Sequence, residues 1–163
     1  MTKKKQINES GLKVIGFDIV CGREHLENLK VNQSRRYILD GIVEGHVYTT
    51  QGVLYFKTEA GFIFDGRSGP KIIDWYVPNL GTFEERLSWF LHDLLGYAQS
   101  LNFKDTNLML FVLLRDLAKY RYVKAKLVQT AVGISDSWYG TPKPTEWCYA
   151  NVGKVVTEWR TAA

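Results

Sequence analysis

The pattern of apolar and polar residues divides the chain into two halves with different periods. The first half contains segments rich in β-branched and aromatic residues, and we expect strands over 13–20, 36–43, 46–50, 53–58 and 62–64. Between 46–50 and 53–58, the dipeptide Gln51-Gly52 is typical of a hairpin turn. Residues 21–34 are polar and fit a loop or one helical turn. The first half therefore predicts an antiparallel meander of four to five strands.

The second half changes to a helical period. Thr82 and Glu85 have the spacing of a capping box, which predicts a helix over 83–100. A second helix is expected to begin near Asp105 or Thr106, because both residues are good N-caps.

A third helix is expected over 122–132, with Gly133 as its C-cap. About three helices thus follow the strands. Strands first and helices afterwards indicate an α+β fold.

Length and composition favour a single domain. The chain has 163 residues, of which 45% are apolar and 23% charged, and this balance is ordinary for a globular protein. Residues 1–10 are Lys-rich and lack periodicity, so we expect a flexible basic arm before a domain over 11–163. No apolar stretch follows the arm as in a signal peptide, and no stretch is long enough to span a membrane.

The two cysteines, Cys21 and Cys148, are far apart and lack a metal-binding spacing. One alternative is a disulfide between them, but we expect two reduced thiols that pack inside a cytosolic protein.

Aromatic residues are frequent, with five Trp, nine Tyr and eight Phe. Those near the C-terminus make residues 137–163 an aromatic-rich extension. Because aromatic side chains dominate the centres of protein interfaces, we expect a contact surface there. Its candidate residues are Trp138, Tyr139, Trp147, Tyr149 and Trp159.

A basic stretch lies between the second and third predicted helices. Two interpretations remain open: a solvated helix junction, or a nucleic-acid surface that combines phosphate contacts with base stacking. The net charge of +4 is too small to imply nucleic acid by itself. The residues concerned are Arg115, Lys119, Tyr120, Arg121, Tyr122, Lys124 and Lys126.

The best candidate for chemistry is His92 with its neighbour Asp93. Placed at steps of about 100° per residue, His92 shares a helix face with Trp89 and lies opposite the main apolar stripe. A carboxylate and an aromatic wall can tune an imidazole for acid–base work. The alternatives are a surface histidine and a histidine in a second packing layer.

A Gly-rich segment precedes this helix. Asp65, Gly66 and Ser68 follow the last predicted strand, and such a loop can offer a carboxylate and carbonyl oxygens to a hard cation. The same residues are also ordinary turn chemistry.

Together the two motifs resemble a domain-of-unknown-function family found in tailed bacteriophages and prophages. That family carries a D-G-A-S-I-P loop, then H-D-Y-L-Y, then a helix with A-D-x-x-F, and the resemblance spans about residues 45–140. The matching positions are Gly61, Phe62, Asp65, Gly66, Ser68, Pro70, His92, Asp93 and Leu95. The chain departs from the pattern at Arg67, Gly69, Leu94, Gly96 and Asn107, the last of which stands nearest to the family's downstream Asp.

The layout also resembles the phospholipase A-two superfamily. That resemblance implies His92 as the base that activates water, Asp93 as a calcium ligand beside Asp65, and Asn107 in place of the Asp that orients the histidine. A neutral Asn stabilises an imidazolium less than a carboxylate does.

Two hypotheses follow. The first is a phage-encoded accessory protein with an eroded His-Asp site, which acts as a binding or structural component of the virion or its assembly. Its partners would be other phage structural proteins or further copies of itself, in the virion or the cytoplasm of the infected host. The alternative is a calcium-assisted hydrolase of lipid or other esters.

Overall fold

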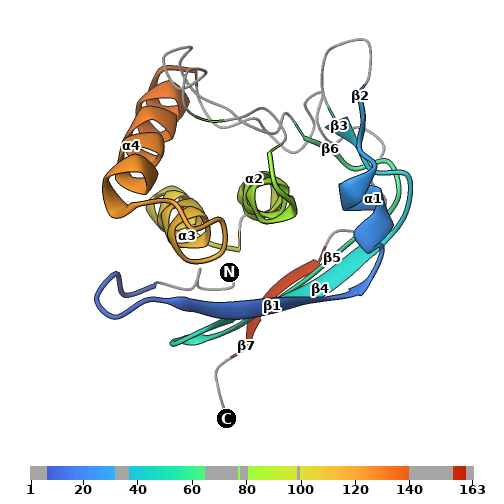
Figure 1. Cartoon of the computed structure of the whole chain (residues 1–163), viewed down its shortest axis with the longest axis horizontal. Coiled ribbons are helices and arrows are strands. Elements are labelled where there is room, and N and C mark those ends of the chain that lie inside the picture. Colours follow the sequence, from blue (N-terminus) through green and yellow to red (C-terminus); the bar gives the residue numbers. More distant parts are fainter. Residues whose placement is uncertain are drawn as a thin grey trace.

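The computed structural model describes residues 7–31, 37–64, 77, 81–98, 100–139 and 156–160. It has an α+β fold in which an antiparallel sheet carries the helices on one face (Figure 1). The main sheet has four strands in the order β1-β4-β5-β7, and all three neighbouring pairs are antiparallel. The strands are β1 (Val14–Cys21), β4 (Val43–Thr49), β5 (Gly52–Thr58) and β7 (Val156–Arg160).

The expected single meander is divided between two sheets. A three-stranded sheet in the order β2-β3-β6 contains β2 (Lys30–Val31), β3 (Tyr37–Ile38) and β6 (Ile63–Phe64). The strand predicted over 36–43 is interrupted because the chain bends at Asp40-Gly41. The backbone there passes so close to the short helix α1 (Arg23–Glu27) that a Cβ on Gly41 would lie 2.1 Å from the His25 ring.

The β4–β5 hairpin predicted around Gln51-Gly52 is confirmed, with Thr49 paired to Gly52. Gly52 has a φ of 147°, and a Cβ there would lie 2.6 Å from the carbonyl oxygen of Arg160. Glycine is therefore needed where β7 pairs alongside β5. The sequence pattern assigned no structure to the C-terminal segment that supplies β7.

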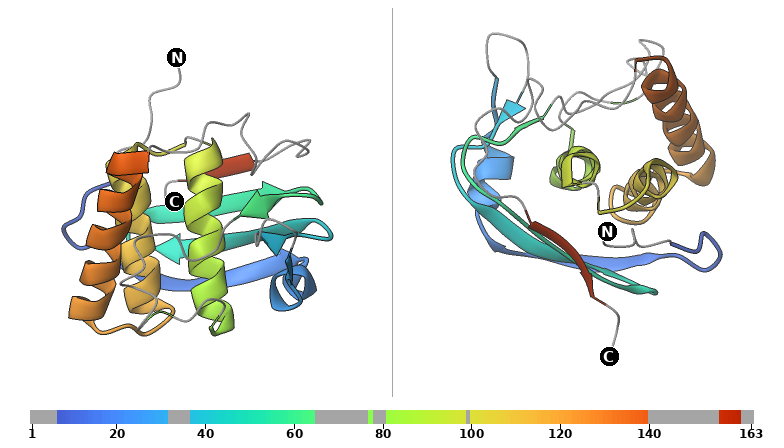
Figure 2. Two further views of the ribbon diagram at one scale, coloured as in Figure 1. Left: turned by 90° about the horizontal axis from the view of Figure 1, so that it is seen from above. Right: turned by 180° about the vertical axis from the view of Figure 1, so that it is seen from behind.

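Three long helices cover one face of the main sheet and run across its strands (Figure 2). They are α2 (Phe83–Ala98), α3 (Phe103–Asp116) and α4 (Tyr122–Tyr139). α2 and α3 lie side by side on the sheet, with α3 against β1 and α2 against β7, and α4 packs on α3. The capping box is confirmed, because the backbone N–H of Glu85 donates to Thr82 Oγ1 and that of Thr82 donates to Glu85 Oε1, each at 3.3 Å.

Two predicted helix ends are wrong. α3 begins three residues earlier than expected, because the Asn102 side chain is the N-cap and accepts from the backbone N–H of Asp105 at 2.8 Å. α4 continues past Gly133, whose φ is not positive. A Cβ on Gly133 would come within 3.9 Å of Asn107 Nδ2, so this glycine lies against α3 instead of ending the helix.

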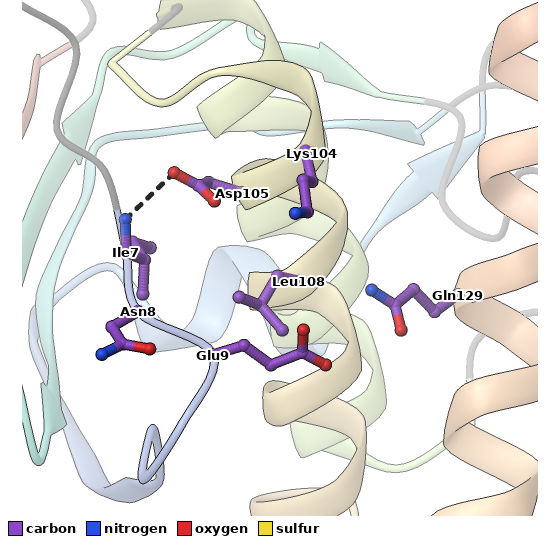
Figure 3. A pocket seen from close by; sticks show the side chains of 7 residues that line it. All are labelled: Ile7, Asn8, Glu9, Lys104, Asp105, Leu108 and Gln129. Carbon is purple, nitrogen blue, oxygen red and sulfur yellow. Dashed lines mark hydrogen bonds between the residues drawn. The ribbon is translucent and has the colours of Figure 1, made fainter.

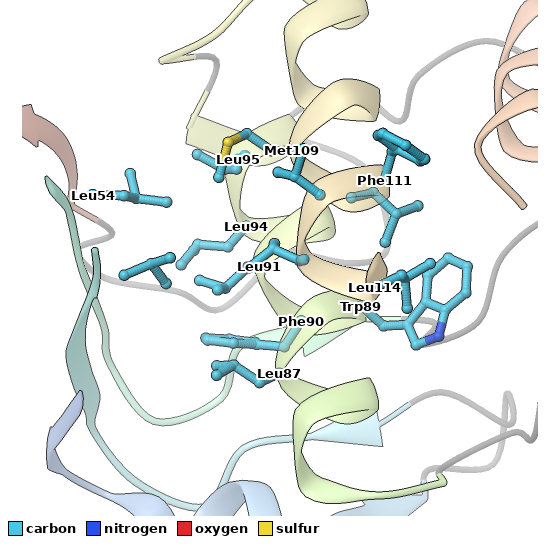
Figure 4. Packing of buried hydrophobic residues seen from close by; sticks show 14 of the residues in the cluster. Leu54, Leu87, Trp89, Phe90, Leu91, Leu94, Leu95, Met109, Phe111 and Leu114 are labelled. Carbon is cyan, nitrogen blue, oxygen red and sulfur yellow. The ribbon is translucent and has the colours of Figure 1, made fainter. Parts of the chain in front are cut away.

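The core surrounds α2, none of whose residues is exposed (Figure 4). Phe90 contacts Phe56, Phe62 and Phe64 edge-on, with ring centroids 5.6–6.0 Å apart. Toward α3, the opposite side of the helix buries Trp89. α2 is thus largely an interior helix, so its buried polar side chains need partners inside the protein. Among the described residues, Trp89 Nε1 is an exception that has no hydrogen-bond partner.

The N-terminal segment is bound to α3 near both ends of the helix. The backbone N–H of Ile7 donates to Asp105 Oδ2 at 3.0 Å, and the Ile7 side chain is buried. The end of the predicted arm over 1–10 is therefore anchored from Ile7 onward. At the other end of α3, the backbone N–H of Val14 donates to Asp116 Oδ2 at 2.8 Å.

Arg115 completes this second anchor. Its guanidinium donates to Asp116 and to the carbonyl oxygen of Leu12. Burial alone would raise the pKa of Asp116, but the hydrogen bonds from Arg115 and the Val14 N–H outweigh it and hold that pKa below its ordinary value.

Glu85 shows how a buried polar group of α2 is satisfied. Its Oε2 accepts from the Tyr120 hydroxyl at 2.5 Å, and both side chains are buried. Burial and then this hydrogen bond to a carboxylate raise the pKa of Tyr120. The pair ties the first turn of α2 to the α3–α4 connection.

We predict that Tyr120→Phe lowers the free energy of unfolding by about 1–3 kcal/mol, because it leaves the buried Glu85 carboxylate without that donor. The matched control is Tyr122→Phe, which removes the same hydroxyl from a side chain that is 60% exposed and should cost less than about 0.5 kcal/mol. Urea denaturation measures the free energy of unfolding of both variants. Equal costs would contradict a stabilising hydrogen bond between Tyr120 and Glu85.

Candidate functional site

His92 lies in the middle of α2 and is only 7% exposed. Its Nε2 is 2.8 Å from Oδ1 of Asn107, on the neighbouring helix α3. The Trp89 ring meets the imidazole edge-on, with centroids 6.4 Å apart. The structure therefore brings together His92 and Asn107, the two residues that the resemblance aligned with a histidine and its orienting residue.

Asp93 approaches the other side of the ring. Its Oδ1 lies 3.3 Å from His92 Nδ1, and the side chains of His92 and Asp93 are 9% and 12% exposed. Both ring nitrogens thus face an oxygen atom of the protein. An imidazole held in this way links two helices, whereas a general base needs one nitrogen turned toward its substrate or a water.

The helical-wheel prediction for His92 is refined by this geometry. The stripe with Phe90 packs toward the sheet, and His92 lies on another side of α2, as expected. That other side is covered by α3, so the histidine belongs to a second packing layer and not to the surface.

The structure leaves several predicted residues unplaced. Asp65, Gly66 and Ser68 lie outside the described residues, as do Trp147 and Tyr149. The expected approach of His92 to the Gly-rich loop stays a prediction.

Two further residues, Trp138 and Tyr139, belong to the last turn of α4, where only the backbone is described. Trp159 lies in β7, and its partly buried side chain packs against the core.

The described residues contain no group of three or more His, Cys, Asp or Glu side chains placed to hold a metal ion. Asp93 is the described member of the predicted calcium pair, and Asp65 is outside that range. Calcium binding therefore stays a prediction. Cys21 is exposed and carries a free thiol, and Cys148 lies outside the described residues.

A second histidine cluster lies on the outer face of the sheet. His46 Nδ1 is 2.9 Å from Asp18 Oδ1, and the Tyr48 hydroxyl donates to Asp18 Oδ2 at 3.1 Å. Desolvation and then this bond raise the pKa of Tyr48. The register of β1 against β4 creates the cluster, so the spacing of its residues along the chain gives no signal for it.

The geometry of the basic stretch favours a helix junction. Tyr120 is buried on Glu85, and Arg115 is bound to Asp116. Lys124 Nζ lies 4.0 Å from the centroid of the Tyr120 ring. These groups are engaged within the chain, which leaves Tyr122 as the exposed aromatic of the stretch.

A hollow of about 280 Å³ lies between the N-terminal segment, α3 and α4 (Figure 3). The hydrogen bond from the Ile7 N–H to Asp105 closes one wall of the hollow. The lining pairs no nucleophile with a base, so it offers no chemistry comparable to the His92 site. The lining residues are Ile7, Asn8, Glu9, Lys104, Asp105, Leu108 and Gln129.

The chain matches no known family model, and no curated protein or solved structure gave a match. The resemblance to a phage domain family therefore stays a prediction. In the part of the chain that the structure describes, no helix has the length and hydropathy needed to cross a membrane.

We predict that His92 and Asn107 are energetically coupled. His92→Leu or Asn107→Leu alone should lower the free energy of unfolding by about 1–3 kcal/mol, because each leaves a buried polar partner unsatisfied. The double variant should cost less than the sum, with a coupling energy of about 0.5–3 kcal/mol in a denaturation-based double-mutant cycle.

The matched control is the more exposed pair of His46 and Asp18, whose side chains are 22% and 50% exposed and for which a cycle with Leu should give a coupling below about 1 kcal/mol. Additive costs at His92 and Asn107 would show that the 2.8 Å contact does not hold the helices together.

Proposed function

We propose that this chain is a bacteriophage-encoded accessory protein that acts by binding, as a component of the virion or of its assembly. The observation that carries the proposal is the state of His92: it is buried, and each ring nitrogen faces an oxygen of Asn107 or Asp93. The motif that resembles a hydrolase site is thus used as a structural link.

The residue types support the same conclusion. Asn107 supplies a neutral amide where the resembled enzymes use a carboxylate, and an amide gives an imidazolium little electrostatic stabilisation. Gly96 replaces the second Tyr of the family's His-Asp motif, which removes another polar group. A site that keeps its histidine and Asp93 but has neither the orienting carboxylate nor the second Tyr of the motif is suited to packing two helices.

The proposal places the chain in the virion or in the cytoplasm of the infected host. Its partners would be other phage structural proteins or further copies of the chain.

One contact favours a second candidate, a calcium-assisted ester hydrolase. His92 Nε2 is bound to a residue of the adjacent helix, which is where the phospholipase A-two layout has its orienting group. Asp93 is next to the histidine, where that layout has a calcium ligand. The hydrolase would require two changes. Asp65 would have to bind calcium together with Asp93, and His92 Nδ1 would have to leave Asp93 and bind a water.

We predict that millimolar calcium leaves the melting temperature of the wild-type chain unchanged and that the chain does not hydrolyse phospholipid or short-chain esters. His92→Ala should lower the melting temperature by about 3–10 °C, because it removes a buried polar link. Differential scanning calorimetry and an ester-release assay measure the two properties, with His46→Ala as the control for removing a partly exposed imidazole.

The opposite pattern identifies the hydrolase. A melting temperature that rises with calcium in the wild type but not in Asp93→Asn would show a bound cation. Ester hydrolysis that disappears in His92→Ala, or increases in Asn107→Asp, would establish catalysis and contradict the binding role.

A separate experiment tests the binding role itself. We expect mass spectrometry to find the chain in purified particles, or in assembly intermediates, of a phage that encodes it. Its absence from both would contradict the proposed role.

A further inference from the structure

α4 has apolar side chains on two opposite faces. Ala125, Val128 and Val132 are fully buried and form the face that packs on α3. At about 100° per residue, Val123, Leu127 and Ile134 lie on the opposite side. A peripheral helix usually presents polar residues to solvent, so the second apolar face needs a separate explanation.

This second face is strongly exposed. The exposed fractions are 67% for Val123, 52% for Leu127 and 46% for Ile134. With Thr130, these residues have spacings of four, three and four, which is the a/d pattern by which helices pair. We call these four residues the outer α4 seam. It runs along the helix at the edge of the molecule (Figure 1).

We propose that the outer α4 seam binds the same seam of a second copy of the chain, with the two α4 helices antiparallel. The heptad spacing points to another helix as the occupant, and a seam that pairs with itself needs no other protein. This inference concerns a surface distinct from the His92 site and does not rest on the proposed function.

Charge decides the orientation. The first turn of α4 has no acidic residue, and the exposed Arg121 stands directly before it. Parallel pairing would bring both basic ends, and the positive ends of both helix dipoles, together. Antiparallel pairing places each basic end beside the negative end of the partner's helix.

The position of the two-fold axis fixes the register of the antiparallel pair. We place the axis across the middle of the seam, so that Val123 lies opposite Ile134 of the other copy and Leu127 opposite Thr130. The three exposed aliphatic side chains then all meet the partner. The seam spans 12 residues, or about 18 Å of helix. With a helix width of about 10 Å, this strip covers roughly 180 Å², well below the roughly 800 Å² per partner of a standard stable interface. We therefore expect a weak, concentration-dependent dimer.

An anionic membrane is the main competing occupant, because exposed apolar and basic residues share α4. The geometry favours the second copy. Lys126 is paired with Glu9, and Lys124 lies over the Tyr120 ring, so both cations are engaged within their own chain. The apolar face is also a narrow four-three-four seam.

The first test is sedimentation equilibrium from about 5 to about 500 µM, a range chosen for a micromolar interface. We expect the wild type to change from monomer to dimer across this range. Leu127→Glu should weaken the dimer at least about tenfold, because two buried carboxylates would replace two apolar contacts. The matched control is Ile15→Glu on β1, which changes a side chain that is 71% exposed and should leave the dimer intact.

The second test reads the orientation by disulfide cross-linking in a background with Cys21→Ser and Cys148→Ser. Val123→Cys combined with Ile134→Cys should form an intermolecular disulfide, because the two positions face each other across an antiparallel seam. Neither single variant should cross-link, since the distance between two copies of either position would far exceed the roughly 7 Å limit between Cα atoms. Efficient cross-linking of the single variants would indicate parallel helices and overturn the proposal.

Three other outcomes also overturn it. A monomer at every concentration excludes the dimer, and a dimer that survives Leu127→Glu lies elsewhere. Flotation of a monomer with phosphatidylglycerol vesicles, lost in Leu127→Glu and kept in Ile15→Glu, assigns the seam to a membrane. Circular dichroism melts of each variant verify that the fold is retained.

Discussion

The burial of most of α2 is the constraint on which the rest of the structure depends. The sheet covers one side of this helix and α3 covers another, so none of its residues is exposed. Such a helix cannot leave polar side chains to water, and an unsatisfied buried group costs about 1–3 kcal/mol. Glu85 is accordingly bound to Tyr120 and His92 to Asn107. These two contacts fix how α3 and the α3–α4 connection lie on α2.

The same enclosure decides how the His-Asp motif is interpreted. A histidine inside the packing layer, with an oxygen at each nitrogen, is a connector between helices. Among the described residues, α4 and the outer face of the sheet present exposed surface outside this enclosure. A chain that acts by binding, as proposed, would therefore use the exterior of this fold, while His92 lies in its interior.

Sequence patterns predicted the local features and missed the nonlocal ones. The hairpin at Gln51-Gly52 and the capping box at Thr82 were predictable because turn and cap chemistry act within a few residues. The start of α3 was missed because Asn102 competes for the cap with Asp105, whose carboxylate is used by Ile7. The nearness of His92 and Asn107 came only from a resemblance, and the enclosure of their contact by α3 required the tertiary packing.

Native-state hydrogen exchange of the α2 backbone amides tests the enclosure most directly. If α2 is the interior helix, the amides of Leu91, His92 and Leu95 exchange only when the whole protein unfolds. Their exchange free energies then equal the free energy of unfolding measured with urea, and they exceed those of the peripheral helix α4. Exchange of the α2 amides as fast as those of α4, with free energies well below global unfolding, would contradict the account.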